Sequence, residues 1–126
     1  MFLEQYANNF DANNFAKYLS LEEFERDYNF FIKNWKKQHL FENISSNSSL
    51  RKIYDSYLKI LEKEDFEIEK EIWFAKIAYQ EKRKLLPNWF IKFLRTIYKK
   101  INDKNKFQKF LEVFVAYHKY FNPSAK

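Results

Sequence analysis

The fold of this chain is decided first by the stretch LRKIYDSYLKIL at residues 50–61. Its apolar side chains recur every three or four residues, which places them on one face of an α-helix. The loop before it, residues 43–49, is rich in serine, a residue that caps helix N-termini. The stretch therefore predicts an amphipathic helix, and the expected buried face consists of Leu50, Ile53, Tyr54, Tyr57, Leu58 and Leu61.

Two segments that flank this stretch show the same spacing. Residues 20–39 begin with Ser20 and Glu23, which form a capping box, and Asp65 favours the start of a helix over residues 65–84. The expected core residues of the first helix are Leu21, Phe24, Tyr28, Phe31, Ile32 and Trp35. Those of the second are Ile68, Ile72, Trp73, Ala75, Ile77 and Tyr79.

Two further helices are predicted toward the C-terminus. Pro87 suits the first turn of a helix over residues 87–101, and Pro123 marks the end of a helix over residues 103–121. The first is expected to bury Trp89, Phe90, Phe93, Leu94, Ile97, Tyr98 and Ile101. The second is expected to bury Phe107, Phe110, Leu111, Phe114, His118 and Phe121.

The remaining segment, residues 1–19, is rich in asparagine and indicates an arm or short helix that docks loosely on the rest. The chain shows no internal repeat and no linker. We therefore expect residues 1–126 to form one helical domain, with residues 1–43 as an N-terminal arm and helix and residues 44–121 as the core.

The amino-acid composition also favours an all-α protein. The chain has no glycine, and the tight turns of β-hairpins usually require it. Helices can end without glycine because asparagine tolerates the left-handed conformation, and Asn43, Asn102 and Asn122 follow apolar-periodic segments. Aromatic residues make up 21% of the chain, enough for a substantial core. The expected fold is a compact bundle of five or six antiparallel helices.

The positive charge of the chain is concentrated at one end. The formal net charge is +6, yet residues 82–126 contain twelve basic and two acidic residues. A basic segment on a nearly neutral body favours a polyanionic partner, although solubility explains part of such a charge.

No catalytic or metal-binding pattern is present in the sequence. The chain has no cysteine, and Glu67, Glu69 and Glu71 alternate around a helix, so they do not converge on one cation. Neither His39 nor His118 has the arginine spacing of helical ribonucleases, and His118 lies on an apolar face, which favours a packed histidine. We expect a non-enzymatic protein without a cofactor.

The sequence also lacks the signals of a membrane or secreted protein. The N-terminus does not match a signal peptide, and nowhere do about 18 apolar residues run without interruption. We therefore expect a cytoplasmic protein.

The chain contains SSNSSLRKIY at residues 45–54, KIAYQEKR at residues 76–83 and FLEVFVAYHKYF at residues 110–121. These three stretches resemble the small subunits of type III-A (Csm) CRISPR effector complexes. The first is similar to that family's Ser/Thr-rich loop before a basic helix start, and the third is close to the family's C-terminal ending. Ser49 stands where the family often has lysine, and Lys82 stands where it often has glycine.

The resemblance implies a bacterial, non-catalytic subunit used in antiviral defence. It implies several copies stacked head to tail, contacts with the backbone and large subunits, and binding to the duplex of guide RNA and target RNA. Such binding needs cations on one surface and no readout of base edges. The residues that we expect to contact RNA are Ser49, Arg51, Lys52, Lys59, Lys76, Lys82, Arg83, Lys92, Arg95 and Lys99.

Other interpretations remain open at this point. A basic stripe is often only a solvated helix face, and Arg51 can form an ion pair with Asp55. Tyr117, Tyr120 and Phe121 fit either base stacking or, as we prefer, a subunit interface. The type III-B (Cmr) small subunit is also helical and basic, and a helical protein-interaction module would bind no RNA. A helix-turn-helix regulator is disfavoured because its short turn usually contains glycine.

Overall fold

A computed structural model gives the structure of residues 2–23, 47–83, 86 and 89–121. These residues form helices and turns without a strand, so the all-α prediction is confirmed for them. The elements, in chain order, are α1 (Phe2–Asn9), the 3₁₀ helix η1 (Ala12–Asn14), α2 (Phe15–Tyr18), α4 (Asn47–Leu61), α5 (Phe66–Lys82), α6 (Phe90–Ile101) and α7 (Lys104–Phe121).

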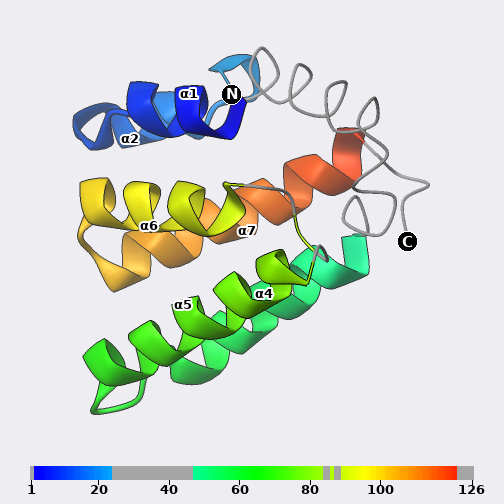
Figure 1. Cartoon of the computed structure of the whole chain (residues 1–126). Coiled ribbons are helices and arrows are strands. Elements are labelled where there is room, and N and C mark those ends of the chain that lie inside the picture. The colour runs from blue at the N-terminus through cyan, green and yellow to red at the C-terminus, as the bar shows by residue number, and fades with distance from the viewer. Residues whose placement is uncertain (1, 24–46, 84–85, 87–88, 122–126) are drawn as a thin grey trace.

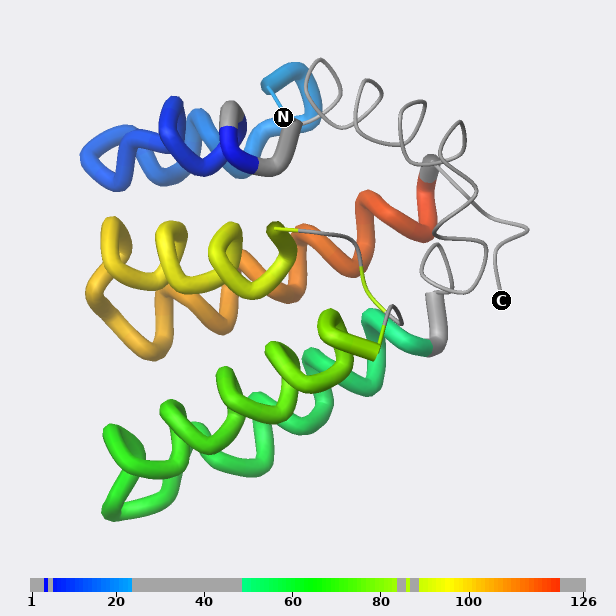
Figure 2. Tube along the Cα trace, in the orientation of Figure 1, coloured from blue at the N-terminus to red at the C-terminus, as the bar shows by residue number. Residues whose placement is uncertain are grey.

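The described helices lie in three layers (Figure 1). The pair of α6 and α7 forms the middle layer, with α1 and α2 above it and the antiparallel pair of α4 and α5 below it. The trace of the chain in Figure 2 follows the same order, and the main contacts between layers are those of α4 with α7, α1 with α6, and α5 with α6. The middle layer is therefore covered on both sides, and α4 and α5 each keep an outer face.

Aromatic rings fill the core. Phe107, Phe110 and Phe114 of α7 stack in sequence, with centroids 6.2 and 6.0 Å apart, and all three are buried as predicted. Tyr57 of α4 is fully buried, and its hydroxyl donates a hydrogen bond of 2.7 Å to the carbonyl oxygen of Lys104. This bond joins the centre of α4 to the start of α7.

Polar residues define the ends of the helices in place of glycine. Asn102 ends α6 in the left-handed conformation, with φ of 49°, as the sequence predicts. Asp103 then accepts hydrogen bonds from the backbone N–H groups of Asn105 and Lys106 at the start of α7, and the bond from Lys106 is the main cause that lowers the pKa of Asp103. The other two predicted asparagine positions lie outside the described residues.

The expectation that the first segment docks loosely is wrong. Tyr6, Ala7 and Phe10 are buried in the core, where Phe10 meets Phe110 edge to face at 5.8 Å. The Lys100 ammonium donates hydrogen bonds of 2.7–2.9 Å to the carbonyl oxygens of Ala7, Asn8 and Phe10. These carbonyls end α1 and lack helical partners, so a lysine distant in sequence caps this helix.

Helices α4 and α5 differ from prediction in which side chains they bury. On α5, Trp73 and Ile77 are buried as expected, together with Phe66 and Phe74. The other residues of the expected core face are exposed, namely Ile68, Ile72, Ala75 and Tyr79. Leu58 of α4 is also exposed, while Ile60 is buried. Apolar residues occur on both faces of α5, so periodicity did not identify the inner face.

The remaining helices agree with the predicted pattern except at the start of α6, which begins at Phe90 and not before Trp89, because Trp89 adopts the left-handed conformation with φ of 75°. Phe90, Phe93, Leu94, Ile97 and Ile101 of α6 are buried, whereas Trp89 and Tyr98 are only partly buried. The backbone N–H of Glu23 donates to the Ser20 hydroxyl at 3.4 Å, one half of the expected capping box. The rest of the helix expected to end at residue 39 lies outside the described residues.

Candidate nucleic-acid interface

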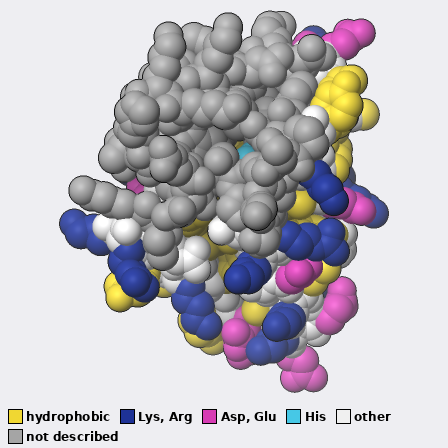
Figure 3. All heavy atoms as spheres, turned by 90° about the vertical axis from the view of Figure 1, so that its right-hand side faces the viewer, with side chains coloured by type: hydrophobic (Ala, Val, Ile, Leu, Met, Phe, Trp, Pro, Cys, Tyr) yellow, Lys and Arg dark blue, Asp and Glu magenta, His cyan; other side chains and the backbone are white. Residues whose placement is uncertain are grey.

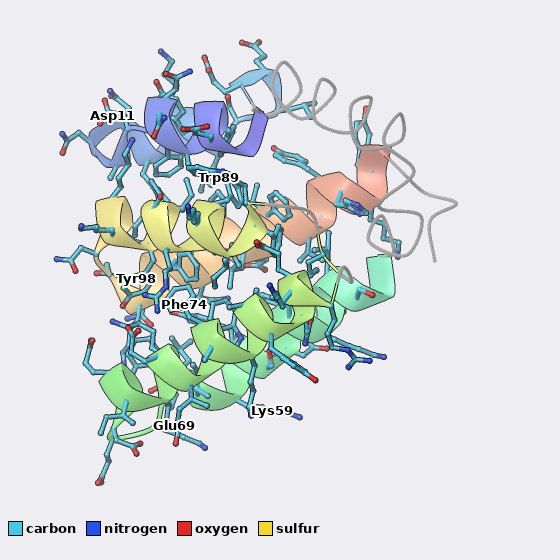
Figure 4. The ribbon with its side chains drawn as sticks, viewed as in Figure 1. Asp11, Lys59, Glu69, Phe74, Trp89 and Tyr98 are labelled. Atoms are coloured by element: carbon cyan, nitrogen blue, oxygen red, sulfur yellow. The ribbon has the colours of Figure 1, made fainter. Side chains whose placement is uncertain are left out.

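A groove of about 520 Å³ runs between α4 and α5 on their outer side. Its apolar part consists of Ile53, Ile60, Ile72, Trp73 and Ile77. Its polar part consists of Ser49, Lys52, Ser56, Lys59, Lys63, Glu69, Lys76 and Gln80. Figure 4 shows Lys59 and Glu69 on the side of this helix pair that faces away from α6. The groove thus has an apolar floor and a predominantly basic edge.

The basic edge arises from helical spacing in the sequence. Lys52, Ser56, Lys59 and Lys63 follow one another at intervals of four, three and four residues along α4 and just beyond its end. Within α4 this spacing places Lys52, Ser56 and Lys59 in one row about 10 Å long, at about 1.5 Å per residue, and Lys63 follows just after the helix. Lys76 faces the same groove from α5. Lysines from two helices therefore converge on one surface.

The floor of the groove is fixed by a buried tryptophan. The Trp73 indole N–H donates a hydrogen bond of 2.9 Å to the Ser56 hydroxyl, which donates one of 2.7 Å to the carbonyl oxygen of Ile53. The same indole meets the Tyr57 ring at 5.2 Å, with the ring planes at 61°. Because these contacts join α4 to α5, they hold the two lysine-bearing faces at a fixed separation.

Most of the groove lysines form no ion pair with a carboxylate of the described residues. Lys63 lies 3.8 Å from the Glu69 carboxylate, whereas Lys52, Lys59 and Lys76 form no ion pair among the described residues. Like charges along one groove reinforce the positive potential there. Figure 3 views one end of the molecule. Many Lys and Arg side chains lie in the lower half of this view, and Asp and Glu side chains lie among them. Net charge alone therefore does not mark the site.

Four of the ten residues predicted to contact RNA line this groove, namely Ser49, Lys52, Lys59 and Lys76. Arg51 lies on α4 outside the groove lining and pairs with Asp55 at 3.2 Å, the ion pair considered from the sequence. Because both side chains are largely exposed, this pair contributes little to stability and leaves Arg51 accessible.

Two predicted residues lie at the end of α5 that is near Ser49. Lys82 and Arg83 are exposed there, and the Arg83 guanidinium lies over the Tyr79 ring at 5.6 Å. Both belong to the same helix pair as the groove, although neither lines it.

The last three predicted residues lie on α6, away from the groove. Arg95 bonds the Glu71 carboxylate at 2.8 Å, and this hydrogen bond lowers the pKa of Glu71. Arg95 also covers the Phe74 ring at 4.6 Å, and Figure 4 shows Phe74 and Tyr98 between α5 and α6. Lys92 lies over the Trp89 ring at 5.0 Å, and Lys99 is exposed. The structure therefore divides the predicted residues between two surfaces.

The sequence did not lead us to predict Lys63 and Gln80 as site residues, although both line the groove. Lys63 lies after the predicted stripe, yet its four-residue distance from Lys59 continues the row and was a usable signal. Nothing in the sequence indicated that the ammonium groups of Lys100 and Lys104 bind backbone carbonyl oxygens. Lys104 donates a hydrogen bond of 2.9 Å to the carbonyl oxygen of Leu61. Part of the basic C-terminal charge is therefore structural.

His118 lies buried in α7, as predicted for a packed histidine. Loss of solvation lowers the pKa of its imidazole to about 4, so the ring is neutral at pH 7. A general acid or base needs contact with a substrate, and this side chain has no exposed surface.

The described residues contain neither a metal-binding cluster nor a membrane-spanning helix. No group of three or more His, Cys, Asp or Glu side chains is placed there to hold a metal ion. No helix of that part of the chain is long and apolar enough to cross a membrane.

Comparison with known proteins identifies the family. The family model described as Csm2 Type III-A matches residues 33–124, a range that contains the groove and all three motifs that carry the resemblance. Neither the curated proteins nor the solved structures provide a match. Because the matched range covers well over half of the chain, the protein belongs to the Csm2 type III-A family, the small subunits of type III-A Csm complexes.

Proposed function

We propose that this protein is a non-catalytic RNA-binding small subunit of a type III-A CRISPR (Csm) ribonucleoprotein, active in antiviral defence in the bacterial cytoplasm. It holds the duplex of guide RNA and target RNA by contacts with the phosphate backbone. The observation that carries this proposal is the convergence of Lys52, Lys59, Lys63 and Lys76 on one groove between two rigidly joined helices.

The chemistry of the groove suits phosphates better than base edges. An ammonium group is a compact point charge that binds phosphate oxygens without selecting a base. In guide complexes, base pairing supplies the sequence specificity and the protein recognises backbone and shape. The row from Lys52 to Lys59 follows the axis of α4 over about 10 Å, and Lys63 extends it just beyond the helix, so the row fits successive phosphates of one strand.

The predicted residues near the groove extend this surface. Arg51 on α4, Lys82 at the end of α5 and Arg83 directly after α5 are exposed on the same helix pair. The stripe of Lys92, Arg95 and Lys99 on α6 remains a second basic surface, but Arg95 is engaged with Glu71. We therefore assign the main RNA contact to the pair of α4 and α5.

RNA binding is tested with the purified protein and RNA duplexes of unrelated sequence. We expect weak affinity that does not depend on sequence and falls steadily with salt. Each neutralised phosphate should contribute about −0.7 to −0.9 to the slope of log K against log salt. Absence of binding at low salt would leave a helical protein-interaction module as the better description.

The proposal also assigns no RNA-cutting activity to this subunit. His118 is buried and neutral, and the groove residues do not include a histidine. We expect labelled RNA to stay intact after incubation with the purified protein. Cutting that His118→Asn abolishes, with the helical circular dichroism spectrum retained, would contradict this assignment.

The outward face of α5 is proposed as a contact with other subunits of the complex, including further copies of this chain. Ile68 is 64% exposed, Ala75 seven residues later continues the stripe on the same side of α5 and is also exposed, and neither lines the groove. Exposed apolar side chains in a row on one helix are typical of a protein interface. Ile68→Glu should reduce co-purification with the backbone and large subunits without weakening RNA binding by the free protein.

A matched variant controls for the added charge. Leu58 is also exposed, at 39%, but lies on α4 and outside this stripe. Leu58→Glu should leave co-purification unchanged. Equal loss in both variants would show that a new charge, and not the α5 stripe, causes the effect.

A further inference from the structure

One face of α5 carries an aromatic residue between two cations. Lys76, Tyr79 and Arg83 follow at intervals of three and four residues, which places them side by side along this face. All three are exposed, and Lys76 lines the groove between α4 and α5. The next residue after Tyr79, Gln80, also lines the groove. Tyr79 therefore lies beside the groove, at the end that is near Ser49.

The tyrosine ring is both supported and accessible. The Arg83 guanidinium lies over the ring, 5.6 Å from its centroid, within the range of a cation–π contact. Tyr79 nevertheless remains 63% exposed, so a large part of its surface faces solvent. A single exposed aromatic residue ordinarily needs no explanation, but this one stands between phosphate-binding charges.

We propose that Tyr79 and Arg83 form a stacking site for an unpaired base of an RNA strand whose backbone lies in the groove. This proposal rests on the proposed RNA-binding function and adds a base contact to it. Proteins that hold single strands combine a basic groove for the backbone with aromatic rings for the bases. Lys76 and Arg83, on either side of the ring, bind the phosphates that flank the stacked nucleotide.

The ligand is an unpaired nucleotide because the faces of paired bases are already covered by their neighbours in a duplex. Ring stacking accepts any base, since each base has a π-face, so the contact is tolerant of sequence. A base contact also differs from a phosphate contact in its salt dependence, because stacking releases no counterions. These two properties separate the site from the lysine groove in an experiment.

The test compares a short single-stranded oligoadenylate with the same ribose–phosphate oligomer lacking its bases. Both ligands offer the same phosphates, so the ratio of their affinities measures the base contact alone. We expect the intact protein to prefer the ligand with bases by about five- to a hundredfold, the range that loss of one stacked base produces. Tyr79→Ala should abolish this preference and leave the salt slope unchanged, whereas Tyr79→Phe should retain the preference.

Two variants serve as controls. Tyr120→Ala removes another exposed tyrosine, 65% exposed on α7, and should leave the preference intact. Lys59→Ala should weaken both ligands equally. Equal affinity of the intact protein for both ligands would overturn the stacking site while the RNA-binding function stands. Loss of affinity for both ligands in Tyr79→Ala would also overturn the stacking site. If the intact protein bound no RNA, or bound RNA with an affinity independent of salt, the proposed function itself would be wrong.

Discussion

Acidification should destabilise this protein through His118, in a pH range where the other perturbed acids contribute little. His118 is fully buried, and burial lowers the pKa of its imidazole from about 6.5 to about 4. The unfolded chain therefore binds a proton between these values that the folded chain does not bind. By linkage, the free energy of unfolding must fall as pH drops through this range.

The magnitude follows from the difference between the two pKa values. Each unit is equivalent to about 1.4 kcal/mol, so a difference of about 2.5 units corresponds to a loss of about 3 kcal/mol when the pH reaches about 4. The lowered pKa values of Glu71 and Asp103 act in the same direction, but only below about pH 4.5. Among the described residues, the range between about pH 6.5 and about pH 4.5 therefore reports mainly on His118.

The assay is urea unfolding followed by circular dichroism at a series of pH values. His118→Phe provides the comparison, because phenylalanine fits an apolar site but cannot bind a proton. Its absolute stability is not the criterion, since a ring of different size also changes packing. We expect the intact protein to lose stability over this range and the variant to lose much less. Parallel pH curves for the two proteins would refute the reasoning.

Two further predictions concern the ends of the helices. Lys100→Met should lower the free energy of unfolding by about 1.5 kcal/mol in urea titrations, because its ammonium bonds three carbonyl oxygens at the end of α1. Lys99, the exposed residue next to Lys100, provides the control. A similar loss of stability in Lys99→Met would contradict the capping role of Lys100. Asn102→Ala should cost about 1 kcal/mol because φ at this position is 49°, whereas Asn102→Gly should be nearly neutral. Equal stability of the alanine and glycine variants would show that the left-handed conformation carries no cost.

The helices were predictable from the sequence where one face alone is apolar. In α6 the apolar spacing alone identified Phe93, Leu94 and Ile97, which are buried. In α5 it did not, because Trp73 and Ile77 on one side and Ile68 and Tyr79 on the other all satisfy a helical period. Choosing between two apolar faces requires the position of the neighbouring helices, which periodicity does not contain.

The candidate site was predictable only in part for a similar reason. The row of Lys52 and Lys59 follows from spacing on one helix, but its proximity to Lys76 depends on the antiparallel pairing of α4 with α5. The use of Lys100 as a cap depends on a contact between residues that are 90 to 93 positions apart. Charge counting treated such a lysine as available for RNA, although its ammonium is already bound to backbone oxygens.

The central claim is that the groove between α4 and α5 binds RNA phosphates. The most direct test compares two variants that lose the same number of positive charges, one in the groove and one on surfaces outside it. One variant replaces Lys52, Lys59 and Lys76 of the groove with alanine, and the other replaces Lys17, Lys106 and Lys109, exposed residues outside it. Both variants lose three positive charges, so any difference between them reports on position.

The measurement is the affinity of each protein for an RNA duplex over a salt series. The account predicts that the groove variant loses affinity and that the slope of log K against log salt becomes shallower by about two units, since each lost phosphate contact removes about 0.7 to 0.9. The control variant should keep a slope close to that of the intact protein. Equal slopes in the groove variant and the intact protein would contradict the account.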